Sequence, residues 1–397
     1  MIFHKIKSDP GLAPDGGTRA WLQVVAGCLI NALTWGYSAS FGVYQLYYTT
    51  EFDFPPSQVS WIGSIQVFLT FFVGVLSGRS ADAGLAQQTV LLGCLMGVLG
   101  TFMTSLATTR HQLLLSEETS LALTTSASGS GVGSIVFPLV VQNLQTKLGF
   151  AWAVRVQAFI ALFFSIIIIS LLKPRLPPRK SGPLMELRAF LEPSYSFFTI
   201  GMFFIFWPLY FAFFYVNTYA TSKIGVSGVT AANLLVIINA VGIPSRPLLG
   251  FLSDRWFGPL PTLVASSTFL ACMLFVWISV KSLGGMYAWV VIYGIATGGT
   301  QGIFVGALAS LTKDPSKMGT RFGMVFSVLG FCTLAGPPTA GGMIENMNGS
   351  FLGAQIWAGV VTITGTLFIV AALLADKRAN AKDSPREGEG ESSSGTP

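Results

Sequence analysis

The chain has 397 residues, of which 52% are hydrophobic and only 10% are charged. A soluble domain carries about 25% charged residues, so the composition excludes an ordinary soluble domain and predicts a multi-pass membrane protein in a lipid bilayer. The formal net charge of +6 does not indicate nucleic-acid binding, because the basic residues are spread over short loops between apolar segments.

Eleven apolar segments come close to or exceed the ~20 residues that a membrane-spanning helix needs. In chain order they cover residues 20–47, 59–78, 87–108, 121–144, 150–172, 196–218, 229–251, 261–280, 287–311, 322–343 and 353–375. The sequence therefore predicts an all-α polytopic membrane protein with about eleven transmembrane helices.

A polar stretch at residues 173–195 leaves five of these segments before it and six after it. Its five basic and two acidic residues give a net charge of +3, which is typical of a cytoplasmic loop. The end of the chain is rich in Ser, Gly and Glu, a composition typical of disorder. The predicted parts are a polar N-terminal tail (1–19), a first transmembrane half (20–172), a basic cytoplasmic linker (173–195), a second transmembrane half (196–375) and a disordered polar tail (376–397).

A short motif occurs twice, at corresponding places in the two halves. Gly-x-x-x-Asp follows the second apolar segment and Gly-x-x-x-Asp-Arg follows the seventh. Glycine permits close helix approach, aspartate accepts hydrogen bonds from a helix N-terminus, and arginine pairs with acids or carbonyl groups. An ordinary polar turn is the alternative to a conformational latch. The latch would consist of Gly78, Arg79, Asp82, Gly250, Asp254 and Arg255.

The sequence offers no catalytic or metal-binding constellation. The four cysteines all lie inside apolar segments, and neither His4 nor His111 has other metal-ligating residues beside it. The glycines at 129, 131 and 133 lack the full spacing and the strand that a nucleotide-binding loop requires, so they indicate helix packing. We expect no enzyme activity, no cofactor and no metal site.

These features resemble the major facilitator superfamily. Within it, Asp15-Gly-Gly followed by Ala20-Trp21 resembles the signature of the monocarboxylate-transporter family. Four further stretches are similar to the fungal branch of that family: Ser60–Gln66, Ala127–Pro138, Gly319–Val325 and Leu352–Ala358. The resemblance covers nearly all of residues 14–374. It implies a two-half helical bundle that transports a monocarboxylate or a related small organic metabolite by alternating access, with a proton as a candidate co-substrate in symport.

The first half departs from this family pattern, because members usually have six helices in each half. Residues 105–126 run almost directly into the segment that resembles the family's fifth helix, and Arg110, His111, Glu117 and Glu118 exclude an ordinary lipid-facing helix there. The fourth helix is therefore expected to be missing, unless residues 105–126 cross or re-enter the membrane as a polar segment. With only five crossings, the two latch motifs would lie on opposite faces. A non-transporting protein, either a degenerate transporter or a sensor, is the alternative function.

Arg246 is the leading candidate for substrate contact. It lies within the 229–251 segment, where facing lipid would cost roughly 2.5–3.5 kcal/mol, so it should face the bundle interior or an aqueous cavity. Followed by Pro247, it matches the family's eighth-helix arginine, and a guanidinium suits a carboxylate. Gly242 and Ala39 occupy the places where proton-coupled members carry an aspartate and a lysine, which argues against classical lactate–proton transport.

Other polar and aromatic residues in the predicted spans are candidates for lining the substrate cavity. For each of them, packing or interhelical hydrogen bonding is the alternative role. The plasma membrane is the expected location, because the sequence shows no other targeting signal. The additional candidate residues are Asn239, Tyr37, Phe41, Tyr44, Tyr215, Asn217 and Gln301.

Overall fold

The computed structural model describes residues 17–51, 55–73, 85–106, 130–172, 186–312 and 318–383. Helices dominate all of these segments, and no strand occurs within them. The predicted all-α fold class is confirmed. Helices occupy all eleven predicted segments, and eight of the described helices are long and apolar enough to cross a membrane.

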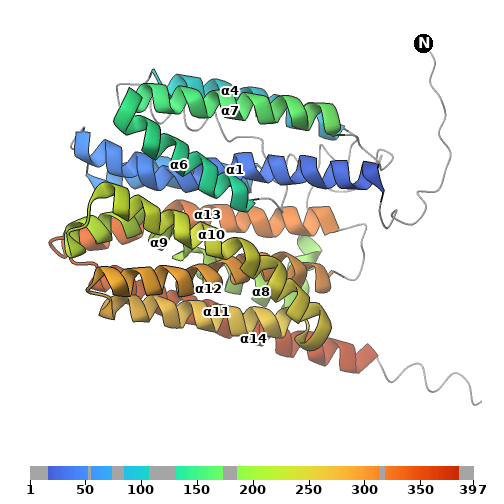
Figure 1. The fold of residues 1–397 in the computed structure, drawn as a ribbon. Coiled ribbons are helices and arrows are strands. Elements are labelled where there is room, and N and C mark those ends of the chain that lie inside the picture. The colour runs from blue at the N-terminus through green and yellow to red at the C-terminus, as the bar shows by residue number, and fades with distance from the viewer. Residues whose placement is uncertain are drawn as a thin grey trace, which may run out of the picture.

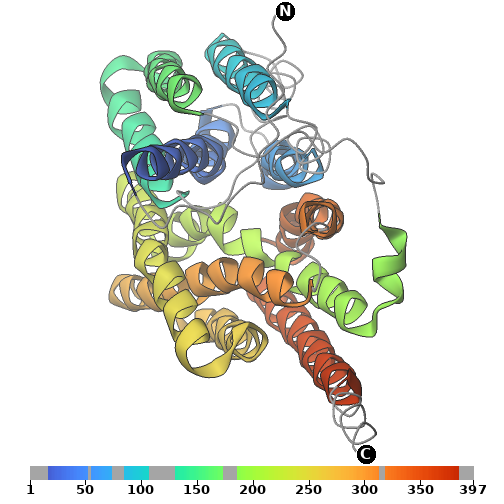
Figure 2. The same cartoon turned by 90° about the vertical axis from the view of Figure 1, so that its right-hand side faces the viewer.

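The helices form two groups, which Figure 2 shows end-on, one above the other. The first group contains α1 (Thr18–Glu51), α2 (Pro56–Phe72), α4 (Ala86–Thr104), α6 (Ser130–Leu148) and α7 (Phe150–Leu171). The second group begins with the short helix η2 (Leu187–Leu191). It continues with α8 (Pro193–Phe206), α9 (Leu209–Tyr219), α10 (Gly228–Leu252), α11 (Pro259–Val276), α12 (Leu283–Ser310), α13 (Met318–Asn346) and α14 (Leu352–Asp383). Short helices η3 (Ala220–Ile224), η4 (Ser253–Phe257) and η5 (Trp277–Ser279) extend α9, α10 and α11.

The helices run roughly parallel to one another, so the bundle has two ends (Figure 1). At the end that we call the linker end, α1 begins and α7 finishes, and the Gln23 amide donates a hydrogen bond to the Leu171 carbonyl at 2.6 Å. At the opposite end, which we call the distal end, α1 finishes and α7 begins, and the rings of Tyr47 and Phe150 stack at 4.1 Å. Helix α14 also finishes at the linker end.

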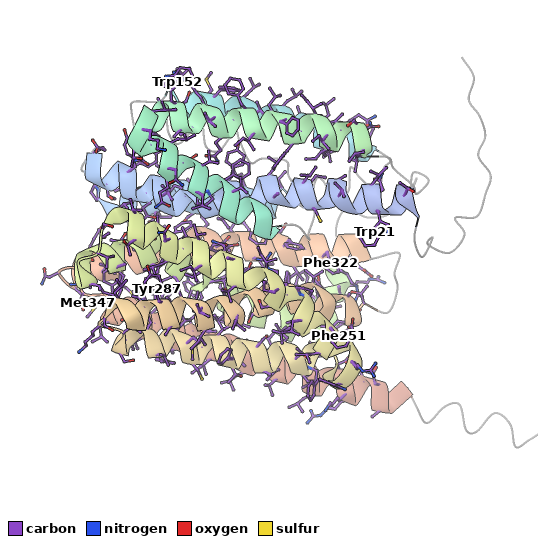
Figure 3. All side chains as sticks on the ribbon, viewed as in Figure 1. Trp21, Trp152, Phe251, Tyr287, Phe322 and Met347 are labelled. Atoms are coloured by element: carbon purple, nitrogen blue, oxygen red, sulfur yellow. The ribbon has the colours of Figure 1, made fainter. Side chains whose placement is uncertain are left out.

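The outer surface of the bundle is apolar over most of its length. Figure 3 shows the side chains of Trp152, Phe251 and Tyr287 on this surface, and they are 53%, 59% and 37% exposed. In water, so much exposed apolar surface would cause aggregation, whereas lipid chains solvate it. The surface therefore fits a bundle surrounded by a bilayer.

The C-terminal boundary differs from the prediction, because α14 continues to Asp383, into the tail expected to be disordered from residue 376. The added segment contains Ala, Lys and Arg, which favour helix. The Asn380 amide also donates a hydrogen bond to the Asp376 carboxylate one turn earlier, at 3.2 Å. Residues 384–397 lie outside the described residues, as do residues 1–16 of the predicted N-terminal tail.

Helices α4 and α6 run in the same direction, from the linker end towards the distal end. The end of α4 lies beside the start of α7, where the Arg155 Nε donates to the Ser105 hydroxyl at 3.4 Å. Helix α6 begins near the middle of α1, since a Cβ added to Gly133 would lie 1.8 Å from the Ala32 carbonyl oxygen. Helix α4 therefore finishes at the distal end, whereas α6 begins about midway between the two ends. The connection, which includes most of the 105–126 segment, lies outside the described residues.

This arrangement removes the conflict that five crossings would create. The first helix group begins and finishes at the linker end, and α10 finishes there too; α2 runs in the same direction, and its described part ends beside Gly330, about midway along α13. The two predicted latch motifs are therefore placed after α2 and at the end of α10, two helices that run towards this same end.

Helices α10 and α12 approach each other unusually closely. Gly294, Gly298 and Gly302 of α12 are spaced four residues apart and face α10. A Cβ on Gly298 would lie 2.6 Å from the Gly242 Cα, and one on Gly302 would lie 2.9 Å from the Arg246 Cα. Only glycine fits such distances, so this contact fixes Arg246 against α12.

Candidate functional site

Arg246 lies six residues before the end of α10, about 9 Å along the helix from Leu252. Its side chain is half-buried and points between α10 and α12, as expected for an arginine that avoids lipid. The Arg246 Nη2 donates a long hydrogen bond of 3.4 Å to the Gln301 Oε1, and the Gln301 Nε2 in turn donates to the Thr297 hydroxyl at 3.3 Å. The structure thus brings Arg246 and Gln301, both sequence candidates, into contact.

A third residue of this site, Tyr210, was missed by the sequence analysis. It is 4% exposed, and its phenol lies close enough to Arg246 for the two to interact electrostatically. The turn at Trp207 and Pro208 separates α8 from α9 and sets the position of Tyr210 in the first turn of α9. A proline inside a predicted span was the available signal, because it marks a break in the helix that often lies beside a cavity.

Arg246 has no acidic partner within the part of the chain that the structure describes. Its Nε is buried and has no hydrogen-bond partner there. The ion pairs at Arg321 contrast with this, since its Nη2 lies 2.5 Å from the Glu192 carboxylate and its Nε lies 3.4 Å from that of Glu186. A buried cation without a counter-ion is costly, so the Arg246 site is chemically suited to receive an anion.

Three other candidates lie where the two helix groups meet. The Asn217 Nδ2 of α9 donates to the Gly42 carbonyl of α1 at 3.3 Å, and the Phe41 and Phe214 rings are 5.0 Å apart. The Tyr215 hydroxyl donates to the Pro337 carbonyl of α13 at 3.3 Å. Phe41, Tyr215 and Asn217 therefore lie at the interface between the halves, on α1 and α9.

The remaining candidates make contacts typical of packing. The Tyr37 hydroxyl accepts a hydrogen bond from Thr101 of α4 at 2.5 Å, and its ring stacks on Phe137 of α6. Tyr44 donates a short hydrogen bond to Gln157 of α7. Tyr37 and Tyr44 thus hold the first half together and are not brought to Arg246. The Asn239 Nδ2 donates to the Leu235 carbonyl of its own helix at 3.0 Å.

Part of the predicted latch is described, and these residues make no latch contact with the other described residues. Asp254 and Arg255 are exposed on η4 and have no ion-pair partner among the described residues. A Cβ on Gly250 would meet open space, so the close helix approach expected of this glycine is wrong for this conformation. Gly78, Arg79 and Asp82 lie outside the described residues.

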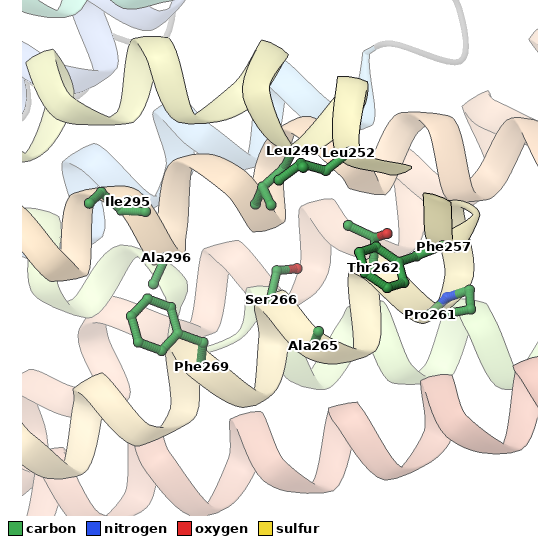
Figure 4. A pocket seen from close by; sticks show the side chains of 10 residues that line it. All are labelled: Leu249, Leu252, Phe257, Pro261, Thr262, Ala265, Ser266, Phe269, Ile295 and Ala296. Atoms are coloured by element: carbon green, nitrogen blue, oxygen red, sulfur yellow. The ribbon is translucent and has the colours of Figure 1, made fainter. Parts of the chain in front are cut away.

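A groove of about 420 Å³ lies between α10 and α11, with α12 as its floor (Figure 4). Its lining includes Phe257 and Phe269, which are 65% and 40% exposed, so it opens on the outer apolar surface. The hydroxyls of Thr262 and Ser266 in its wall already donate to backbone carbonyls of α11 and the preceding turn. No predicted site residue lines this groove, and it offers no charged group that would bind an anion.

Comparison with known proteins agrees with this geometry. The profile described as Major Facilitator Superfamily matches residues 83–337. The chain belongs to this superfamily. An MFS-type transporter of Gibberella zeae is 39% identical over 93% of this chain and 90% of its own length. An aspyridones efflux protein of Emericella nidulans is 30% identical over 90% of this chain and 78% of its own length.

A similar fold occurs in solved structures. A bacterial homologue of the human lysosomal transporter Spinster, in an inward-facing and occupied conformation, aligns with a TM-score of 0.66 at 16% identity. The alignment covers 92% of this chain and 98% of that structure. The chain is therefore a multi-pass membrane protein of the MFS transporter type. Nothing in these comparisons supports the non-transporting alternative.

Proposed function

We propose that this chain is a secondary transporter that exports a small organic anion, with Arg246 as the contact for the anionic group. The observation that carries the proposal is the Arg246 guanidinium, which is withdrawn from lipid, held between α10 and α12, and unpaired with any acid of the described residues. A carboxylate is the anion of choice, because the planar guanidinium matches its two oxygens. Substrates of the monocarboxylate type fit this site.

Export is the direction that the relatives favour, because one of them is named as an efflux protein. Proton symport remains a candidate. It would need a proton-binding group other than an aspartate one turn before Arg246, because Gly242 occupies that place. An exported monoanion needs no coupled ion. A membrane potential that is negative inside favours its exit by about 2.3 kcal/mol for each 100 mV. A plasma membrane provides this potential and is the expected location.

Transport would proceed by rocking of the two halves around the site. The halves meet through α1 and α9, α2 and α13, and α6 and α10, where the Gln142 Nε2 donates to the Val229 carbonyl at 2.9 Å. These contacts would break and reform during the cycle. The latch residues Gly250, Asp254 and Arg255, with Gly78, Arg79 and Asp82, would hold one conformation and release in the other.

We also infer that residues 105–126, most of which lie outside the described residues, cross or re-enter the membrane in place of the fourth helix of other members. The linker end, which carries the basic 173–195 stretch, would face the cytoplasm. Epitope tags at the N-terminus and within residues 173–185 should then both be inaccessible from outside intact cells. Tags on opposite sides of the membrane would exclude this topology.

The transport proposal is tested with Arg246→Gln and Arg246→Lys in proteoliposomes that are given a membrane potential, with biphenyl-4-carboxylate as the probe. The glutamine variant should lose about 30-fold or more of the initial rate, because the charge pair with the substrate is lost. The lysine variant should retain part of the rate, since the charge remains while the fork is lost. Arg188→Gln, on the exposed surface of η2, is the matched control. An unchanged rate in Arg246→Gln would remove this residue from the site.

A further inference from the structure

Five polar side chains without formal charge come from α1, α2 and α9: the Tyr215 hydroxyl lies near the Gln45 and Ser60 side chains, Ser64 is one turn after Ser60, and the Asn217 Nδ2 donates to the Gly42 carbonyl, three residues before Gln45. We call them the interhalf polar cluster: Gln45, Ser60, Ser64, Tyr215 and Asn217. All five are at most 1% exposed. The first three belong to the first half and the other two to the second half, so the cluster lies on the surface along which the halves separate.

Several polar atoms of this cluster have no hydrogen-bond partner. Both amide atoms of Gln45, the Ser64 hydroxyl and the Asn217 Oδ1 are buried and unsatisfied. The Tyr215 hydroxyl lies near the Gln45 and Ser60 side chains, yet Gln45 stays outside hydrogen-bond geometry. A buried amide without partners is unfavourable, and more than 90% of such groups in folded proteins are satisfied. A group that enters the cluster and supplies donors and acceptors would satisfy these atoms.

Helix α9 connects this cluster to the Arg246 site. Tyr210 lies beside Arg246, and Tyr215 is five residues further along, about 7.5 Å towards the distal end. The Phe214 ring lies 6.3 Å from that of Tyr210 and 5.0 Å from that of Phe41, which is one turn before Gln45 on α1. An aromatic surface therefore connects a cationic group to a neutral polar group.

The cluster also lies on a route to the distal surface. A pocket of about 310 Å³ opens there between the end of α9 and the end of α13, and Tyr215 contributes to its lining. The exposed residues Lys223 and Glu345 lie around it. A molecule passing from Arg246 to the distal end would meet the cluster before this pocket.

We propose that the interhalf polar cluster is a second, neutral binding site for a hydroxyl or carbonyl oxygen of the transported anion. The inference rests on the proposed transport function and adds the class of substrate. Gln45 and Asn217 can each donate and accept a hydrogen bond, while the absence of charge within the cluster disfavours a second anionic group. The substrate class is an elongated aromatic carboxylate with an uncharged oxygen at the end far from the carboxylate.

Two matched probes test this inference: biphenyl-4-carboxylate and 4′-hydroxybiphenyl-4-carboxylate, which differ only in the distal hydroxyl. Their Kd values are measured by calorimetry with the full chain in lipid nanodiscs. We expect the hydroxylated probe to bind about fivefold more tightly, as one additional hydrogen bond predicts. In Gln45→Leu this ratio should fall to about one, while the affinity for biphenyl-4-carboxylate stays unchanged.

Gln355→Leu is the control, because Gln355 of α14 is also a buried glutamine with an unsatisfied Nε2 but lies outside the cluster. It should keep the fivefold preference. Equal binding of the two probes to the native chain, or an undiminished preference in Gln45→Leu, would overturn the neutral site. The transport proposal survives the loss of the neutral site if both probes bind the native chain and both bind the Arg246→Gln variant more weakly. If neither probe binds the native chain, both proposals fail.

Discussion

Arg246 and Arg321 both lie in the second helix group and are both withdrawn from the surface, yet their surroundings differ. Arg321 is 6% exposed and is held by Glu192 and Glu186, while its guanidinium lies over the Tyr195 ring at 5.5 Å. Among the described residues, Arg246 donates a side-chain hydrogen bond only to the neutral Gln301 and lies near the neutral Tyr210. An arginine with its acids in place is structural, whereas one that lacks them is available to a ligand.

The largest effect is expected from a substitution that removes this difference by giving Arg246 an acidic partner. Gln301→Glu would place a carboxylate where the Gln301 Oε1 now accepts a hydrogen bond from Arg246. Transport should fall about 100-fold, because freeing the guanidinium from a buried carboxylate costs about 3 kcal/mol. The initial rate in proteoliposomes measures the effect, and Gln301→Met controls for loss of the amide. A Gln301→Glu variant with the native rate would show that transport does not require Arg246 to be free of an acidic partner.

The second prediction concerns the packing that holds Arg246 in place. Gly298→Ala would force α10 and α12 apart, since its Cβ would lie 2.5 Å from the Ser245 hydroxyl and 2.6 Å from the Gly242 Cα. We expect a loss of about 1–3 kcal/mol in the free energy of unfolding. The transport rate should fall about tenfold through misplacement of Arg246. The free energy of unfolding is measured in mixed detergent micelles, and the transport rate of the same variant is measured in proteoliposomes.

Gly306→Ala provides the control for that variant, because Gly306 is on the same helix and a Cβ there meets nothing within 4 Å. It should leave the transport rate unchanged and stabilise α12 slightly, since alanine favours helix over glycine. Equal effects of the two substitutions would mean that close α10–α12 packing does not position the arginine.

The smallest effect on transport is expected from Arg321→Gln. It removes the ion pairs with Glu192 and Glu186, whose side chains are 46% and 17% exposed. Because solvent screens Glu192, the free energy of unfolding should fall by only about 1–2 kcal/mol. The transport rate should stay within about threefold of the native value, because the partners of Arg321, which are Glu186, Glu192 and Tyr195, are not those of Arg246. A large loss of transport with normal stability would contradict the structural role of Arg321.

The helices were predictable from the sequence because apolar segments of spanning length leave the backbone no other solution in lipid. Arg246 was predictable for the same reason, since a charge inside a span is conspicuous. Its contact with Gln301 depends on helix register, which the glycine spacing of α12 sets and the sequence analysis did not use. The extension of α14 was missed because composition alone does not separate an exposed polar helix from a polar tail.

The neutral parts of the interior were harder to predict. Gln45 has nothing in its sequence surroundings that separates it from packing residues, and Tyr210 is marked only by the nearby Pro208. Tyr37 and Tyr44 were expected to line the cavity, but both face α4, α6 and α7 within the first half. Which side of a helix faces the other half depends on its rotation, and an almost wholly apolar helix has no periodic pattern that reveals it.

The glycine contact between α10 and α12 also limits how substrate preference can diversify. Because Gly294, Gly298 and Gly302 leave no room for any larger side chain, we expect α10 and α12 to move as one body, with Arg246 staying beside Gln301. New side chains cannot be added on that surface without separating the helices. The opposite wall, formed by α1, α2 and α9, carries no such restriction at Gln45, Ser64 or Asn217. We expect preference for different anions to change through this wall, while the contact for the charge stays constant.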